Sequence, residues 1–328
     1  EAWKAACARI LTSERYEKLD LPPQLGLIPL GADPPSGLEE FLHWESHERG
    51  TPLPARDKNG RFRLSEGTGL VFVLIPGGTF RMGAERPATP DARGPNLDPD
   101  AESSESPVKD VTLAPYFISK YEMTQGQWLR VMGTSPSKHG PGGRPYATRS
   151  GLQKTTLLHP VEQVSWDHCR EAMERLGLLL PTEAQWEHSA RGGGTTIWHC
   201  GDDKSALDEH ENLADAFGAA NGAPAGFSHD EDLNDGRTIH APVGTYLPNG
   251  FGLFDVGGNV REWCRDRYGS YTNAVGNGDG ERTPDTGSRT RVVRGGSFDD
   301  PALLARVTFR DRGEPPFVNI SLGARPSR

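Results

Sequence analysis

The chain has 328 residues, a formal net charge of -9, 34% hydrophobic residues, 40 glycines and 27 prolines. It contains no run of basic residues and no apolar run of membrane-spanning length, which argues against nucleic acid as a partner and against membrane insertion. This length is enough for one large domain or for one domain plus an appendage, and the glycine and proline content indicates that much of the chain is ordered loop.

The cysteines are widely spaced and form neither a CxxC motif nor a Cys/His cluster with zinc spacing: Cys7, Cys169, Cys200 and Cys264. A domain of this size does not need disulfides, so we expect free thiols and favour a reducing, cytoplasmic compartment, with the cell surface left open. Cys169 lies on the apolar face of a predicted helix and Cys264 follows Trp263, so both are expected to be buried.

Residues 1–66 carry too little apolar content for a core of their own. They are predicted to form an N-terminal extension or linker that packs on a main domain of residues 67–328. Short helices are predicted over residues 3–16 and 38–47, the second capped by Ser36. Asp57-Lys-Asn-Gly60 is typical of a hairpin turn between short strands.

The main domain begins with strands and continues with capped helices. Residues 69–83 predict two strands around a Pro-Gly-Gly turn, residues 85–106 an exposed loop, and residues 111–121 further strand. Three helices are predicted from a capping residue to a terminal glycine: Thr124 to Gly133, Ser165 to Gly177, and Thr182 to Gly192. Little helical periodicity follows residue 194, so the predicted fold class is α+β with an irregular, β-rich second half.

Six motifs then occur along the main domain, in this order: Pro76–Gly83, Tyr121–Gln125, His159–Ser165, Leu180–Glu187, Asn249–Trp263 and Arg294–Ser297. Together they make residues 69–328 similar to the formylglycine-generating enzyme (sulfatase-modifying factor) family. The resemblance implies a variant C-type lectin fold, which is loop-rich and has little regular secondary structure.

The resemblance also says which residues would carry catalysis. The oxidases of the family bind copper through two cysteines shortly after Gly-Gly-Ser, and those two places hold Asp300 and Ala305 in this chain. No cysteine follows Cys264. Because Cu(I) prefers soft thiolates and carboxylate does not replace them, we predict that the chain is not an enzyme, and we expect neither copper nor iron.

Two alternatives stay open. One is a metal-dependent oxidase or an enzyme like the iron-dependent sulfoxide synthases of the same family, whose His-x-x-x-His-x-Glu motif is nearly matched by His43 and His47. Arg49 stands at the place of the glutamate, and its charge would repel iron. The other alternative is a sensor or docking module of a larger polypeptide, because the resembled domain is often fused to kinases or proteases.

Two structural calcium sites are also implied by the resemblance. The first maps onto Asp255, the carbonyls of Gly258 and Val260, and Glu262. The second maps onto Asn212, Leu213, Asp235 and the carbonyl of Arg237. Hard oxygen ligands are what Ca²⁺ requires. The alternative is that these Asp and Asn side chains cap their own turns.

The C-terminal segment carries apolar residues where family members commonly carry polar ones: Phe298, Phe309, Phe317, Val318 and Ile320. They lie between two frames, Arg294–Ser297 and Leu322–Pro326. One branch of the family comprises the variable proteins of diversity-generating retroelements, in which adenine-templated mutation changes residues in this stretch. Phe, Ile and Ser can be reached from an Asn codon in this way, so Phe309, Phe317, Ile320 and Ser321 fit that pattern.

We therefore predict a non-catalytic protein that binds a protein ligand through its C-terminal face. The predicted ligand-binding residues are Phe298, Asp299, Asp300, Thr308, Phe309, Asp311, Phe317, Val318, Asn319, Ile320 and Ser321. The alternative is that the apolar residues are ordinary core. Their solvent exposure distinguishes the two, because a binding face fails if most of the five apolar side chains are buried.

Overall fold

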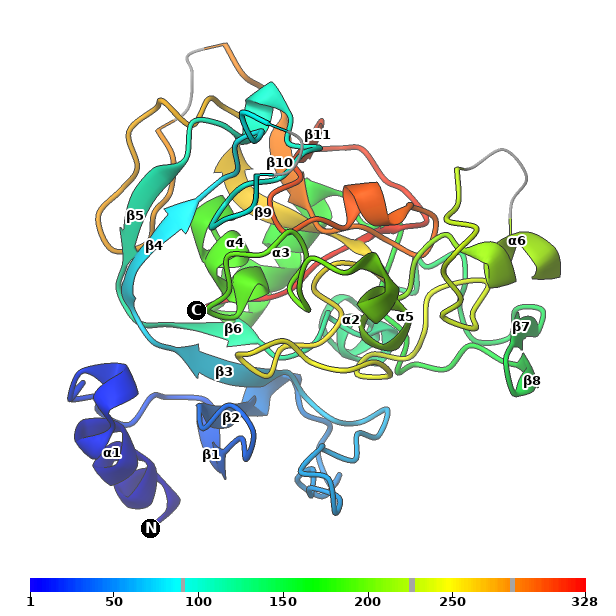
Figure 1. Cartoon of the computed structure of the whole chain (residues 1–328). Helices are drawn as coiled ribbons and strands as arrows, with labels where there is room; N and C mark the ends of the chain where they lie inside the picture. The colour runs from blue at the N-terminus through cyan, green and yellow to red at the C-terminus, as the bar shows by residue number, and fades with distance from the viewer. Residues whose placement is uncertain (90–91, 224–227, 284–286) are drawn as a thin grey trace.

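The structure, a computed structural model, describes residues 1–89, 92–223, 228–283 and 287–328. Two four-stranded sheets, in the orders β1-β2-β3-β6 and β11-β10-β9-β12, organise the chain, and helix α4 lies between them (Figure 1). Two short antiparallel pairs, β4-β5 and β7-β8, complete the β structure of the described residues. This mixture of helices and separate sheets confirms the predicted α+β class.

The strands are β1 Leu27–Ala32, β2 Glu39–His43, β3 Val71–Ile75, β4 Gly78–Met82, β5 Lys109–Leu113, β6 Tyr116–Ser119, β7 Tyr146–Thr148, β8 Gly151–Gln153, β9 Arg261–Arg267, β10 Arg291–Arg294, β11 Asp311–Gly313 and β12 Leu322–Gly323. The α-helices are α1 Ala2–Thr12, α2 Gln125–Met132, α3 Trp166–Leu176, α4 Glu183–Arg191, α5 Leu207–His210 and α6 Ala216–Asn221. Short 3₁₀ turns are η1 Glu14–Tyr16, η2 Trp44–Ser46, η3 Ser103–Glu105, η4 Lys204–Ala206 and η5 Ala302–Leu304.

The three capped helices begin and end where the sequence predicts. Thr124, Ser165 and Thr182 each accept a hydrogen bond from the third helical N–H, and the side chain at that position bonds back to the cap. Each helix ends at a glycine in the left-handed region, with φ between 57° and 70°. Local chemistry therefore determines these helices, since both caps satisfy backbone groups that the helix itself leaves unpaired.

The predicted helix over residues 38–47 is wrong. Residues 39–43 form strand β2, which lies between β1 and β3, and every one of its side chains is buried. In the sequence, Glu40 looks like a residue on the polar face of a surface helix. In the structure, its carboxylate pairs with Lys120 at 2.5 Å and with Arg56 at 2.5 Å. Buried ion pairing thus hides the strand pattern from a sequence-based prediction.

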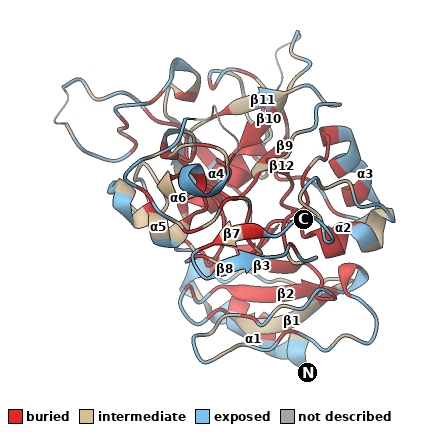
Figure 2. Ribbon diagram, turned by 90° about the vertical axis from the view of Figure 1, so that its right-hand side faces the viewer, coloured by how far each residue is buried: buried red, intermediate tan, exposed pale blue. Residues whose placement is uncertain are grey.

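Residues 1–66 are not a separate body in the described structure. Strands β1 and β2 extend the sheet of β3 and β6, and Tyr16 donates a hydrogen bond to the Leu74 carbonyl at 2.9 Å. Figure 2 shows β2 and β3 as buried, with β1 partly buried and α1 on the outside. The predicted turn at residues 57–60 is present, since Asp57 N–H donates to Arg61 O at 2.7 Å.

The predicted exposed loop over residues 85–106 is partly buried. Asn96, Asp98 and Glu105 are each at most 3% exposed, whereas residues 90 and 91 lie outside the described part of the chain. The loop turns inward because its two buried carboxylates pair with Arg306, more than 200 residues later in the chain.

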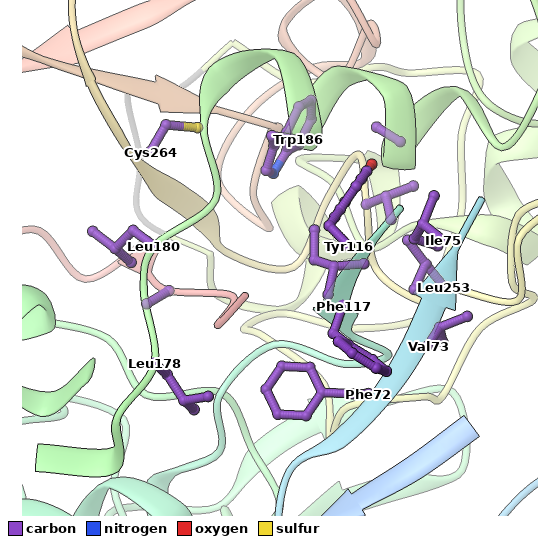
Figure 3. Packing of buried hydrophobic residues seen from close by; sticks show 14 of the residues in the cluster. Phe72, Val73, Ile75, Tyr116, Phe117, Leu178, Leu180, Trp186, Leu253 and Cys264 are labelled. Carbon is purple, nitrogen blue, oxygen red and sulfur yellow. The ribbon is translucent and has the colours of Figure 1, made fainter. Parts of the chain in front are cut away.

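Aromatic and aliphatic side chains from both sheets and from α4 form one main core. Figure 3 shows Trp186 of α4 among the side chains between Cys264 of β9 and Tyr116 of β6. The buried positions of Cys169 and Cys264 confirm the sequence prediction, and the four cysteines are free. Among the described residues, no helix has both the length and the apolarity needed to cross a membrane.

The C-terminal residues connect the two sheets. Leu322 of β12 pairs in parallel with Arg261 of β9, and six residues later Phe117 N–H of β6 donates to the Arg328 carbonyl at 2.9 Å. The C-terminus therefore lies beside the first sheet (Figure 1). Both ends of the segment between β10 and β12 are consequently fixed in the core.

Candidate ligand-binding face

Arg294 fixes the start of the C-terminal segment from inside the protein. Its fully buried guanidinium donates to the Glu187 carboxylate at 2.6 Å and to the backbone carbonyls of Val307, Thr308 and Phe309 at 2.7–3.0 Å. Burial opposes the charge, yet Tyr271 and Glu187 raise the pKa of Arg294 above its usual value. One side chain therefore shapes the turn that leads to the predicted face.

Arg325 fixes the other end of the segment in the same way. It pairs with Glu262 at 2.7 Å and donates to the carbonyls of Phe254 and Asp255 at 2.8 and 2.9 Å. Arg306 and Arg310, within the segment, pair with Glu105 at 2.9 Å and with Glu183 at 2.6 Å. All four arginines are at most 4% exposed, so buried charge pairs support the segment in addition to the short strands β11 and β12.

Asp300, the residue that the resemblance places at the first copper-binding cysteine of the family, forms a salt bridge. Its two carboxylate oxygens accept hydrogen bonds from Nε and Nη2 of Arg261, and Ser297 Oγ donates to the same carboxylate. Arg261 also donates to Asp311 at 2.8 Å. Ala305, at the second place, is 2% exposed and offers no ligand atom in its side chain. The Asp300 carboxylate is thus occupied by the Arg261 guanidinium.

The five apolar side chains of the predicted face differ in exposure. Phe317 and Val318 are 48% and 41% exposed, Phe309 and Ile320 are intermediate, and Phe298 is 6% exposed. Most of the five are therefore not buried, and the condition that would contradict a binding face does not arise. Binding itself stays a prediction.

Four of the predicted ligand-binding residues are nevertheless buried. Asp300 pairs with Arg261, Thr308 donates to Glu105 at 2.5 Å, and Ser321 donates to Asn319 at 3.2 Å. Phe298 packs edge-on against His139 and His240, with ring centroids 5.8 and 5.7 Å away. We correct the predicted face accordingly, because these side chains hold its shape and do not present themselves to a partner.

The accessible part is the segment between β11 and β12, and we call Phe317 and Val318 the apolar patch. A turn supports it, in which Phe317 N–H donates to the Glu314 carbonyl at 2.9 Å. Below the patch, Trp263 and Gly313 are so close that a Cβ at Gly313 would lie 2.6 Å from the indole. Asn319 O accepts the Gln163 N–H at 2.9 Å. The patch is therefore exposed on a fixed backbone, which lowers the entropic cost of binding.

Three histidines lie beside Phe298, and no sequence motif predicts them: His159 and His240 are buried and His139 is half-buried. The rings of His139 and His159 are 5.5 and 5.4 Å from that of His240, and Glu162 lies 3.8 Å from His240 Nε2. Burial lowers the pKa of both His159 and His240 to about 3. These side chains are far apart in the sequence and follow no metal-ligand spacing, so only the fold brings them together.

The two histidines of the alternative iron motif have other places and partners in the structure. His43 lies on a strand and His47 follows a 3₁₀ turn, so they do not share a helical face. His47 accepts the Gly69 N–H at 3.1 Å and bonds to Thr51 O at 2.9 Å. In the described part of the chain, no three His, Cys, Asp or Glu side chains are grouped so that they could hold a metal ion.

At the first implied calcium site, one ligand atom is available and another is in use. Asp255 Oδ1 is buried without a hydrogen-bond partner among the described residues, whereas Oδ2 accepts the Gly244 N–H at 2.8 Å. Burial, reinforced by Glu211, raises the pKa of Asp255 to about 7. The Glu262 carboxylate, in contrast, accepts hydrogen bonds from Arg325 and from Trp186.

The second implied calcium site also contains one available oxygen. Asn212 Oδ1 is buried and has no hydrogen-bond partner in the described structure. The two oxygens of Asp235 accept the N–H groups of Leu213 and Arg237 at 2.7 and 2.8 Å. Burial and then the charge of Asp215 raise the pKa of Asp235 well above its usual value. The carboxylate of Asp215 is buried and that of Asp235 is half-buried, so two like charges lie close together at this place.

Comparison with known proteins agrees with this fold. Residues 63–328 match the sulfatase-modifying factor enzyme 1-like domain. The chain is 31% identical over 269 residues to a formylglycine-generating enzyme of Thermomonospora curvata, which covers 69% of this chain and 82% of that protein. It is 26% identical over 312 residues to an inactive C-alpha-formylglycine-generating enzyme 2 of Bos taurus, covering 81% of this chain and 91% of that protein.

Two solved structures share the fold at 22% sequence identity. PvdO from Pseudomonas aeruginosa matches with a TM-score of 0.61, covering 85% of this chain and 99% of its own. Treponema denticola variable protein 1 matches with a TM-score of 0.54, covering 84% of this chain and 99% of its own. With the family match over most of the chain, these likenesses establish that the protein belongs to the formylglycine-generating enzyme, or sulfatase-modifying factor, family and has its C-type lectin-like fold.

Proposed function

We propose that this chain is a non-catalytic member of its family that binds a protein ligand through the apolar patch. The observation that carries the proposal is the exposure of Phe317 and Val318, at 48% and 41%, on a segment whose two ends are held by buried arginines. Exposed aromatic and aliphatic anchors on a rigid backbone are typical of protein-binding sites.

The proposed absence of catalysis rests on the Arg261–Asp300 pair. A guanidinium and a carboxylate stand where thiolates would be needed for copper, and the neighbouring Ala305 is buried. The similarity to a bovine protein described as inactive supports the same proposal, although other relatives are described as formylglycine-generating enzymes. We therefore expect no oxygen consumption when copper and a thiol peptide are supplied.

The binding proposal is tested by selecting ligands from a phage-displayed protein library on the immobilised chain. Replacing Phe317 and Val318 together by Ala is expected to lower the affinity for the selected ligands about tenfold or more. The reason is that hot-spot side chains buried in an interface typically contribute more than 1 kcal/mol each. The free energy of unfolding should change by less than about 1 kcal/mol, since both side chains are exposed.

The matched control is Leu25→Ala, which removes an equally apolar side chain that is 93% exposed on the N-terminal part of the chain. This control should leave ligand binding unchanged. Selected ligands that bind the Phe317/Val318 double variant as well as the parent would contradict the proposal, and so would copper-dependent oxygen consumption.

Two finer proposals concern the origin of this surface. The fold is shared with a variable protein, which supports diversification of the C-terminal segment by a retroelement. The chain is also 28% identical to a serine/threonine-protein kinase of Chlamydia pneumoniae, covering 77% of this chain and 37% of the kinase, which supports a docking module in a larger protein. Genomic sequence tests both.

Diversification predicts a nearby reverse transcriptase gene and a near-repeat of the segment coding for residues 298–321, with differences at adenines. A docking module predicts a kinase or protease domain in the same open reading frame. A genomic locus with neither feature contradicts both finer proposals and leaves the binding proposal standing.

Calcium at the two implied sites is a separate proposal. Asp255 and Asn212 each present a buried oxygen without a partner among the described residues, which fits a hard cation. Calcium added after chelation is expected to raise the unfolding midpoint. The free energy of unfolding should rise by about 2.7 kcal/mol when free calcium is at a hundredfold excess over its Kd. Asp255→Asn should remove much of this gain, while Asp110→Asn, on an exposed strand position, should not. An unchanged midpoint at millimolar calcium would exclude the proposal.

A further inference from the structure

Strand β11 lies at the end of the molecule opposite α1 (Figure 1). Arg312 of β11 and residues from neighbouring loops line a polar groove. Its volume is about 760 Å³, within the range of small-molecule sites. Its described lining does not include Phe317 or Val318, so it is distinct from the apolar patch. We propose that this groove binds a hydroxyl-rich small molecule, such as a sugar, that carries a phosphate or sulfate monoester.

The charge of the groove favours an anion. Arg289, Arg310 and Arg312 line it, and none of its described lining residues is Asp or Glu. Glu183 neutralises Arg310 through two hydrogen bonds of 2.6 and 2.8 Å, but no ion pair joins Arg289 or Arg312 to another described residue. Arg289 and Arg312, which have no ion-pair partner among the described residues, offer two guanidinium groups to an oxyanion in a protein of net charge -9.

Arg310 and Arg312 are both restricted in position by contacts within the protein. Arg310 directly precedes β11 and Arg312 lies on it, and their side chains extend to the same side, toward Tyr268. Both guanidinium groups lie over the Tyr268 ring, at 4.6 and 4.9 Å from its centroid. Arg310 is fixed further by hydrogen bonds to the carbonyls of Ser104 and Gly269. Stacking restricts Arg312, which lowers the entropic cost of binding an anion.

The rest of the wall is suited to a ligand with several hydroxyl groups. Its serine and threonine residues are Ser103, Ser104, Ser106, Ser270, Ser288 and Thr290. Each hydroxyl both donates and accepts hydrogen bonds, so together they match a sugar better than an apolar ligand. The space is also larger than a bare inorganic ion requires, since a water-sized species takes about 30 Å³.

The experiment is calorimetric titration of the full chain with a hexose 6-phosphate, a hexose 6-sulfate, the parent hexose and inorganic phosphate. Saturable binding of at least one ester is expected, about tenfold or more tighter than the parent hexose, and weaker at high salt. Replacing Arg289 and Arg312 together by Ala should lower the affinity for the ester by roughly a hundredfold, because each lost charge-assisted hydrogen bond reduces the affinity about tenfold.

Two further variants make the result specific. Arg312→Lys keeps the charge but loses the planar fork, so an intermediate loss is expected. Arg63→Ala removes an exposed arginine in the loop between η2 and β3 and should change nothing. Both replaced groove arginines are exposed, so the double variant should keep the parent unfolding midpoint.

Preference for one ester identifies phosphate or sulfate as the source of the anion, and either preference supports the proposal. The proposal is overturned if neither ester binds saturably, if only inorganic phosphate binds, or if the double variant binds the ester as tightly as the parent. Because the apolar patch is separate, the Phe317/Val318 double variant should bind the ester normally. Failure of either proposal is thus distinguishable from failure of the other.

Discussion

Replacing Arg294 by Met is expected to lower the free energy of unfolding by about 3–5 kcal/mol, the cost of breaking a buried ion pair on one side. The change removes the charge that faces Glu187 and leaves the carbonyls of Val307, Thr308 and Phe309 without these donors. Although burial opposes it, Arg191 and Arg294 hold the pKa of Glu187 below its usual value, so that this carboxylate stays charged in the core.

Urea unfolding monitored by tryptophan fluorescence measures this effect. The control is Arg170→Met, because Arg170 pairs with Glu174 on the exposed side of α3 and such pairs contribute less than about 1 kcal/mol. Hydrogen exchange at residues 307–309 should also become faster in the Arg294 variant. A loss below about 1 kcal/mol, with unchanged exchange, would show that the buried pair does not hold the segment.

Lys120→Met is expected to lower the free energy of unfolding by about 3–5 kcal/mol, because it also removes one partner of a buried ion pair. The Lys120 ammonium is 1% exposed and bonds to Glu40 of β2 at 2.5 Å and to Asp33 at 3.2 Å. Removing it leaves Arg56 as the remaining cation beside both carboxylates, at 2.5 Å from Glu40 and 3.7 Å from Asp33. Burial already raises the pKa of Glu40. Lys109→Met, on an exposed position of β5, is the matched control.

This second variant also tests whether residues 1–66 fold together with the rest of the chain. Because Lys120 joins the main domain to β2, the variant should unfold in one transition at lower urea and expose the whole chain to protease together. A protease-resistant fragment of residues 67–328 with the parent midpoint would instead show that the N-terminal segment is a separable extension.

The sequence predicted best where structure depends on neighbouring residues. The helices α2, α3 and α4 have both ends encoded in three or four adjacent residues, so their boundaries could be read directly. Strand β2 and the buried part of the 85–106 loop could not, because their carboxylates are stabilised by Lys120 and Arg306, which lie 80 and about 200 residues away. A buried glutamate with a distant partner looks like a surface residue in the sequence.

The same distinction applies to the binding face. Ordered motifs identified the family, and the sequence correctly drew attention to the segment between Arg294 and Arg325. Only the tertiary structure separated the exposed Phe317 and Val318 from the buried Phe298, since burial depends on packing against His139 and His240. No sequence pattern predicted the groove at β11.

By itself, then, the sequence determined the family, the α+β class, three helices and the absence of cysteines after Cys264, because these follow from residue identity and local capping. The tertiary structure alone decided that Arg261 pairs with Asp300, that residues 1–66 share the sheet of the main domain, and which apolar side chains reach solvent. Each of these depends on contacts between residues distant in the chain, and such contacts form only when the whole core assembles.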